Sequence, residues 1–247
     1  VKKTEITQFQ NVRRNGLIAI KLREGDELEW IKQTTGDNRV VIATRSGKCI
    51  QFDESDVRSM GRSSMGVRGI RLKENDEVIQ MDVVPVEGNA DLLIVTENGL
   101  GKRTPLSSYR FQARGGSGVK TANLSTKTGK IIGAAVLEEG LEGDLIIMSK
   151  GGQIIRLPIA SIPTRGRATQ GVYLMRVKKA DLVASISLIR SEITEEENEE
   201  EAKKEEKPKK SAKETSKKAA PKPKKKSTKS KKSSDEKDKE SIQPTLI

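Results

Sequence analysis

The chain of 247 residues is strongly basic, with 47 lysines and arginines against 35 aspartates and glutamates, and such a surplus favours nucleic acids and other polyanions as partners. It has no histidine and one cysteine, which excludes histidine-based acid–base catalysis, zinc sites, and Ser-His or Cys-His nucleophiles. No apolar run approaches the roughly 18 residues of a membrane span and no signal-peptide pattern is present, so we expect a cytoplasmic protein without a membrane partner.

Residues 1–190 repeat themselves. Each unit contains a glycine followed by an aliphatic residue, and these four dipeptides are named the markers: Gly16-Leu17, Gly66-Val67, Gly118-Val119 and Gly171-Val172. The marker glycines follow one another at intervals of 50, 52 and 53 residues. Such spacing is typical of propeller-like and other repeat architectures.

In chain order, the predicted strands surround three hairpin turns, where glycine reaches positive φ without steric cost. The turns are Ser46-Gly47, Asn98-Gly99 and Gly151-Gly152. Strands are expected before them at 40–42, 92–95 and 145–148, after them at 49–52, 101–104 and 154–157, and after the markers at 28–31, 78–84, 131–136 and 182–189. The pattern predicts an all-β fold of about four propeller-like blades.

The blades are expected near 1–47, 48–99, 100–152 and 153–190. By the period, one further turn glycine would fall just before Val1, so we expect this sequence to be a fragment of a longer protein. The single cysteine, Cys49, lies in an expected strand and is interpreted as a small core residue.

The composition changes near residue 191. Residues 192–206 are mostly acidic and 207–232 are almost purely basic, whereas all six aromatic residues come earlier. A segment of this composition buries too little apolar surface to offset its chain entropy, so 191–247 is predicted to be a disordered tail. It is either a solubilising extension or a regulatory one, in which the acidic block competes with DNA and the lysine block adds affinity.

Basic residues recur in a loop just before each marker and in the strand after each turn. The candidate phosphate-contacting residues are Lys2, Lys3, Arg13, Arg14, Arg62, Lys102, Arg103, Arg110, Arg114, Lys120, Arg156, Arg165 and Arg167. Guanidinium groups form two-pronged contacts to phosphates, and the neighbouring glycines let backbone N–H groups approach an anion. If the units share one geometry, these residues form a continuous basic track. With few aromatic platforms for unpaired bases, the track favours bent duplex DNA.

Several of these segments resemble the C-terminal domain of DNA gyrase A subunits. The most specific run is 57–72, VRSMGRSSMGVRGIRL, and the segments 1–4, 98–104 and 169–172 resemble other units of that domain. The resemblance implies a β-pinwheel of Greek-key blades, truncated at its N-terminal side, that wraps duplex DNA. It also implies a complex of two A and two B subunits, in which ATP and magnesium are used outside this chain to drive negative supercoiling in the bacterial cytoplasm.

The family's gyrase box, QRRGGKG, belongs to a blade that this sequence is expected to lack. The nearest string, Gln112–Gly118, keeps five of the seven positions but lacks one arginine and the lysine, so it is interpreted as a related loop. The catalytic tyrosine of the family belongs to the N-terminal part of the whole protein. Tyr109 and Tyr173 are therefore expected in the core, and no catalytic or metal-binding residue is assigned.

Two other interpretations remain open from the sequence. One is the equivalent domain of topoisomerase IV, which has fewer blades and a degraded box. The other is a propeller-like scaffold for protein interaction, whose charge serves solubility. An enzyme of another type is a distant third and would require a pocket with convergent carboxylates.

Overall fold

The structure is a computed structural model that describes residues 1–190 and 245–246. The predicted disordered tail falls almost entirely on residues 191–244, outside the described residues. The described part is all-β, with short 3₁₀ turns and no α-helix, which confirms the predicted fold class. No helix within it is long and apolar enough to cross a membrane.

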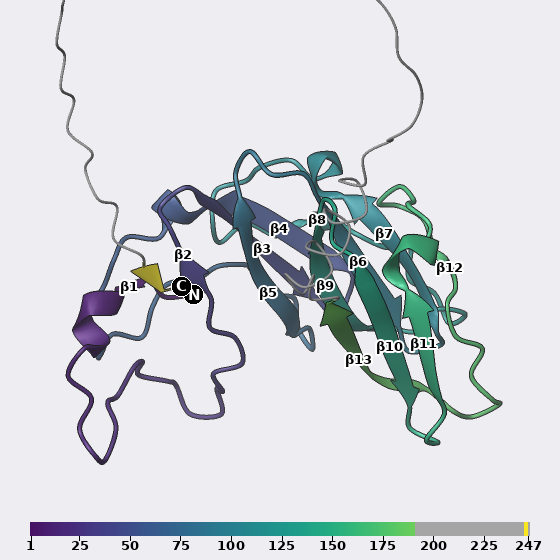
Figure 1. Cartoon of the computed structure of the whole chain (residues 1–247), viewed down its shortest axis with the longest axis horizontal. Helices are drawn as coiled ribbons and strands as arrows, with labels where there is room; N and C mark the ends of the chain where they lie inside the picture. The colour runs from purple at the N-terminus through teal and green to yellow at the C-terminus, as the bar shows by residue number, and fades with distance from the viewer. Residues whose placement is uncertain (191–244, 247) are drawn as a thin grey trace, which may run out of the picture. The chain divides into compact units, whose positions relative to one another are not determined.

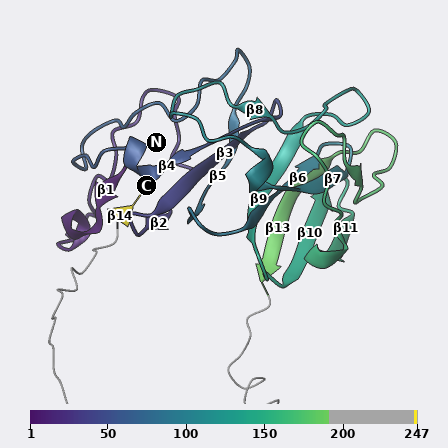
Figure 2. The ribbon, with the colours of Figure 1, turned by 90° about the horizontal axis from the view of Figure 1, so that it is seen from above.

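Three larger antiparallel sheets follow one another in chain order (Figures 1 and 2). The first contains β3 (Asn38–Thr44), β4 (Lys48–Asp53), β5 (Val78–Pro85) and β8 (Val119–Lys120), in the order β5-β3-β4-β8. The second contains β6 (Ala90–Thr96), β7 (Leu100–Pro105), β9 (Ile131–Glu138) and β12 (Val172–Tyr173), in the order β12-β7-β6-β9. The third contains β10 (Gly143–Ser149), β11 (Ile154–Pro158) and β13 (Val183–Arg190), in the order β11-β10-β13.

The three predicted hairpins are confirmed. Gly47, Gly99 and Gly152 turn with φ of 79°, 77° and 82°, in the left-handed region that glycine enters without penalty. Each hairpin leads into a one-turn 3₁₀ helix; these are η2 (Glu54–Asp56), η3 (Leu106–Ser108) and η4 (Ile159–Ser161), and η1 (Ile6–Phe9) occupies the same place in the first unit.

One predicted strand is wrong. Residues 28–31 form no strand, and only β2 (Gln33–Thr34) follows them. The corresponding strand β5 pairs with β3 along seven registered positions, whereas 28–31 have no registered strand partner among the described residues. An extended segment without a neighbour to satisfy its backbone groups does not form a sheet.

A small fourth sheet has the order β1-β14-β2, with β1 at Thr4–Glu5 and β14 at Thr245–Leu246. Thr245 pairs with Glu5 and Thr34, and Leu246 pairs with Thr4 and Gln33. β14 therefore takes the central place that β3 holds between β4 and β5 in the first large sheet.

The units exchange strands, which the sequence did not predict. Strand β8 pairs with β4 and β12 pairs with β7, so the markers at Gly118 and Gly171 close the sheets of the preceding units. The marker glycine makes this possible: at Gly118 a Cβ would lie 2.8 Å from the Cys49 carbonyl oxygen, and at Gly171 it would lie 2.5 Å from that of Gly101. Only a residue without a side chain permits such an approach.

The core lies between successive sheets, so the central strands are buried on both faces. All seven residues of β3 are buried. Val41 and Ala43 pack toward the second sheet, and Val40 and Ile42 pack on the opposite side against Phe52 and its neighbours. This explains the continuous apolar runs 40–43 within β3 and 92–95 within β6.

Candidate nucleic-acid interface

Three arginines occupy equivalent places just before successive markers. They lie in three segments named the arginine loops: 58–64, 110–117 and 163–170. A guanidinium nitrogen of Arg62 donates to the carbonyl oxygen of Ile18 at 3.2 Å, that of Arg114 to Arg68 at 3.4 Å, and that of Arg167 to Lys120 at 3.1 Å. Each acceptor lies two residues after a marker glycine of the preceding unit. The same contact thus recurs three times.

A backbone hydrogen bond repeats with the same spacing. The N–H groups of Lys21, Arg71 and Asn123 donate to the carbonyl oxygens of Ser64, Gly116 and Thr169, at 3.2, 2.8 and 3.1 Å. Each donor lies five residues after a marker glycine, and each acceptor lies two residues before the following marker glycine. Every arginine loop is therefore bound to the segment that follows the marker of the preceding unit.

These contacts join the loops in series. Loop 58–64 leads directly into the marker segment 66–71, which holds loop 110–117, and that loop leads into segment 118–123, which holds loop 163–170. The basic loops consequently lie next to one another in the order of the chain, and their spacing is fixed by hydrogen bonds.

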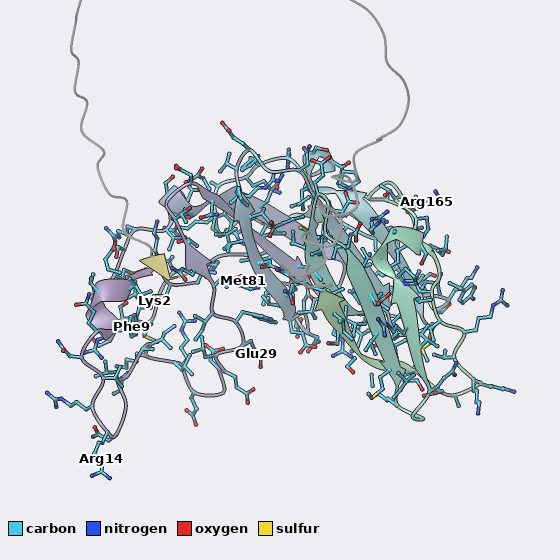
Figure 3. The ribbon with its side chains drawn as sticks, viewed as in Figure 1. Lys2, Phe9, Arg14, Glu29, Met81 and Arg165 are labelled. Carbon is cyan, nitrogen blue, oxygen red and sulfur yellow. The ribbon has the colours of Figure 1, made fainter. Side chains whose placement is uncertain are left out.

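The predicted cations of the arginine loops, together with Arg13 and Arg14 before the first marker and Lys120 after the third, are named the loop cations, and most keep their charge toward solvent. The side chains of Arg13, Arg14, Arg110, Arg114, Lys120 and Arg165 are exposed, and those of Arg62 and Arg167 are half-buried. Arg14 lies at the tip of its loop and points away from the sheets (Figure 3). None of these eight residues forms an ion pair with a described carboxylate.

Three cations of the strands after the turns have carboxylate partners. Lys3 contacts the buried Glu54 at 2.5 Å, Arg103 lies 3.8 Å from Asp91, and Arg156 contacts Asp144 at 2.5 Å. Arg103 Nε also donates to the carbonyl oxygen of Ile162. These three cations therefore differ from the loop cations, which have no carboxylate partner among the described residues.

For Lys2 and Lys102, the predicted contact with phosphate is wrong. Both are buried, and Lys102 is 0% exposed, so neither amine faces a partner at the surface. Burial lowers the pKa of Lys102 to about 8, with a smaller contribution from the nearby positive charge of Arg167. The pKa of Lys2 is lowered in the same way, by burial first and by the charge of Arg62 second. The amines instead donate to backbone carbonyls: Lys102 to two in loop 163–170, and Lys2 to Arg62 in loop 58–64 and to Ala19. The sequence could not reveal this because the loop acceptors are backbone atoms about 60 residues away.

Comparison with known proteins gives the family. The model of the DNA gyrase C-terminal domain, a β-propeller, matches residues 1–35, 38–85, 90–138 and 143–190. The chain belongs to this family. The DNA gyrase A protein of Staphylococcus aureus strain MRSA252 is 40% identical to it over 196 residues, which are 79% of this chain and 22% of that protein. The chain thus spans about a fifth of the length of its curated relatives.

Solved structures of related domains share the fold. The C-terminal domain of a DNA topoisomerase IV superposes with a TM-score of 0.71 at 22% identity, covering 83% of this chain and 63% of that one. A DNA gyrase A C-terminal domain superposes with a TM-score of 0.59 at 27% identity, covering 71% and 59%. These results confirm the expected pinwheel-type fold and the resemblance to gyrase A.

In this gyrase-family domain, the box-like string Gln112–Gly118 forms part of an arginine loop. Gln112 N donates to the carbonyl oxygen of Gln51 at 3.0 Å, and Gly115 N donates to that of Gly69 at 2.6 Å. Arg114 Nε donates to the carbonyl oxygen of Asp56 at 2.8 Å. The string is therefore held against both the strand and the marker segment of the preceding unit.

The two tyrosines differ. Tyr109 is buried as predicted, its hydroxyl hydrogen-bonds Thr121, and Arg167 lies over its ring at 5.8 Å. Tyr173, expected in the core, is 47% exposed, with Lys127 and Arg176 over its ring at 5.7 and 5.6 Å. It occupies the second position after the marker glycine, as Lys120 does, and that position faces outward. The sequence did not predict this exposed cluster of Tyr173 with two cations, because a single tyrosine in a strand-like segment has the pattern of a core residue.

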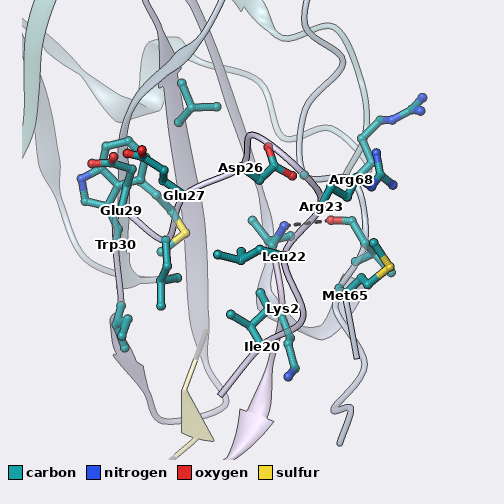
Figure 4. A pocket seen from close by; sticks show the side chains of 18 of the residues that line it. Lys2, Ile20, Leu22, Arg23, Asp26, Glu27, Glu29, Trp30, Met65 and Arg68 are labelled. Carbon is teal, nitrogen blue, oxygen red and sulfur yellow. Dashed lines mark hydrogen bonds between the residues drawn. The ribbon is translucent and has the colours of Figure 1, made fainter. Parts of the chain in front are cut away.

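A cavity of about 880 Å³ lies between segment 19–31 and the first large sheet. Its lining includes Trp30 and Met65, and also Asp26, Glu27 and Glu29. Glu27 and Glu29 lie together beside Trp30, and Asp26 lies apart from them (Figure 4). No hydrogen bond or ion pair joins these three exposed side chains to the described residues. Among those residues no cluster of metal-ligating side chains occurs either. The cavity therefore does not carry a catalytic assignment.

Proposed function

We propose that the arginine loops form a track that binds the phosphate backbone of duplex DNA and bends it. The support is the serial connection of the loops: the same two hydrogen bonds fix each loop on the unit before it. Fixed spacing between cations favours a partner with a regular charge pattern, such as a double helix.

The charge distribution supports the same partner. The eight loop cations, Arg13, Arg14, Arg62, Arg110, Arg114, Lys120, Arg165 and Arg167, have no carboxylate partner among the described residues. Bending a 20–30 bp site by 40–90° costs roughly 1–6 kcal/mol, which added phosphate contacts offset. Contacts to the backbone rather than to bases imply readout by deformability.

Within a whole protein, the domain would act as the DNA-wrapping part of DNA gyrase A in the bacterial cytoplasm. The similarity to gyrase A of Staphylococcus aureus supports this role. The partners are then gyrase B and the rest of gyrase A, and the ATP and magnesium of the reaction are bound outside this chain. By itself the domain would bind and bend DNA without cleaving it.

The test is a titration of a fluorescent 40-bp duplex between 50 and 300 mM salt. We expect log affinity to fall linearly with log salt, with a slope of about −0.9 for each phosphate contact. The triple variant R62A/R114A/R167A should bind about a hundredfold more weakly, because each of the three removed contacts costs about 1 kcal/mol. No binding at low salt, or a flat salt dependence, would refute the DNA track.

The control variant is R103A/R156A, which removes two arginines that have carboxylate partners. This variant should leave the slope of log affinity against log salt, named the salt slope, nearly unchanged. A loss equal to that of the triple variant would mean that general charge, and not the loops, governs binding.

A further inference from the structure

Lys102 is buried beneath an arginine loop. Its amine donates to the carbonyl oxygens of Gly166 at 2.6 Å and Arg167 at 2.8 Å, and to Thr169 Oγ1 at 3.2 Å. The ammonium has three protons and no acceptor, so these three bonds use its full capacity. No proton is left for a phosphate.

The same arrangement occurs in the first unit. The Lys2 amine donates to the carbonyl oxygens of Ala19, at 2.6 Å, and of Arg62. Arg62 and Arg167 are equivalent loop positions, four residues before a marker glycine. Two buried lysines therefore bind the backbone of the arginine whose guanidinium reaches the preceding unit.

The alternate units hold the loop in a different way. Ile50 occupies the place of Lys102, and a Cβ on Gly116 would lie 3.4 Å from Ile50 Cδ1. Loop 110–117 thus packs directly onto the apolar side chain of Ile50. In the fourth unit the equivalent residue is Ile155. An isoleucine therefore fits this position in the sheet but offers no donor to the loop.

We propose that Lys102 and Lys2 are positioning residues, which hold the backbone of their arginine loops so that the loop cations meet the DNA phosphates. Lys102 acts on loop 163–170 and Lys2 acts on loop 58–64. The role in DNA binding rests on the proposed function. The contact itself, a buried amine holding a loop backbone, does not depend on it.

Because burying a charge is costly, the buried ammonium of Lys102 contributes more to the position of the loop than to the stability of the fold. Desolvation of an ammonium is costly, and an apolar replacement of similar size is often neutral or stabilising. The freed carbonyl oxygens of loop 163–170 lie near the surface, since Gly166 and Thr169 are exposed, and water can satisfy them. The loop would lose its position while the fold remains.

The experiment compares the whole chain with Lys102→Ile, Lys102→Arg, R165A/R167A and the combined K102I/R165A/R167A variant, using the 40-bp duplex. K102I should bind about tenfold more weakly with a thermal midpoint close to that of the parent. In the R165A/R167A background the same change should have less than a twofold effect, because a positioning residue acts through the arginines it places. Additive losses would mean a direct phosphate contact and would overturn the proposal.

Amide exchange gives a readout that does not need DNA. K102I should speed exchange in loop 163–170 and leave loop 58–64 unchanged, whereas Lys2→Ile should do the reverse. Unchanged exchange in the matching loop overturns the proposal, whatever happens to affinity. If the parent chain binds no DNA but exchange rises as expected, the loop contact stands and the DNA track fails. K102R, which keeps the charge but is bulkier, should restore less than half of the lost affinity; full rescue would show that charge alone matters.

Discussion

Gly171 approaches Gly101 so closely that a Cβ on Gly171 would lie 2.5 Å from the Gly101 carbonyl oxygen. The marker glycine also has φ of 86°. Conformation and close approach therefore both require glycine at this position. The contact lets β12 close the sheet of the preceding unit. It also fixes the position of arginine loop 163–170, which comes directly before Gly171.

Replacing this glycine should destabilise the domain. We expect Gly171→Ala to lower the free energy of unfolding by about 2–4 kcal/mol, because left-handed strain and a backbone clash act together. Gly16→Ala is the matched control: it has φ of 78° but nothing within 4 Å of its Cβ position, so it should cost only about 1 kcal/mol. Urea unfolding measures both; equal losses would show that the close approach is unimportant.

Two exposed arginines separate the loop cations from the strand cations. Among the described residues, the guanidinium of Arg165 donates only to the carbonyl oxygen of Thr164, at 3.2 Å, whereas that of Arg156 contacts Asp144 through two of its nitrogens. R165A should weaken duplex binding and reduce the salt slope by about 1. R156A should change the slope by much less, since the Arg156 guanidinium is already paired with Asp144 and makes no phosphate contact. The prediction is wrong if the two variants have the same salt dependence.

The buried Lys102 should give stability and DNA affinity opposite dependences on pH. Burial lowers its pKa from 10.5 to about 8, so above pH 8 the folded state loses this proton before the unfolded state does. The free energy of unfolding should therefore rise between pH 7 and pH 9, by about 1 kcal/mol relative to K102I. Over the same range affinity should fall about threefold, because a neutral amine has two protons for three acceptors. Chemical unfolding and duplex titration at pH 7, 8 and 9 measure the two trends. Parallel trends in the parent and K102I would exclude Lys102 as their source.

Cys49 should be inert in the folded protein. It is 0% exposed, and burial raises the pKa of its thiol to about 12. A thiol reagent at pH 8 should modify it only on unfolding, and at once in denaturant. Above pH 9 the unfolded state releases the thiol proton first, so the free energy of unfolding should fall with rising pH. Rapid modification of the native protein would contradict the burial of β4.

Patterns within single units made much of this fold predictable. The turn glycines Gly47 and Gly99 located the hairpins because positive φ is a local property. The apolar runs at the centres of β3 and β6 were recognisable because strands buried on both faces are apolar at consecutive positions. The failure at residues 28–31 has a non-local cause, since a strand also needs a neighbour that no local pattern specifies.

The sequence by itself determined the repeat, the hairpins, the basic loops and the family resemblance, because these depend on local conformation and composition. Only the tertiary structure decided what each cation does. Lys102 and Arg165 look alike in the sequence, yet one is buried beneath a backbone and the other reaches solvent. The reason is physical: the environment of a charge is set by atoms more than 50 residues away, which arrive only when a marker crosses into the preceding unit.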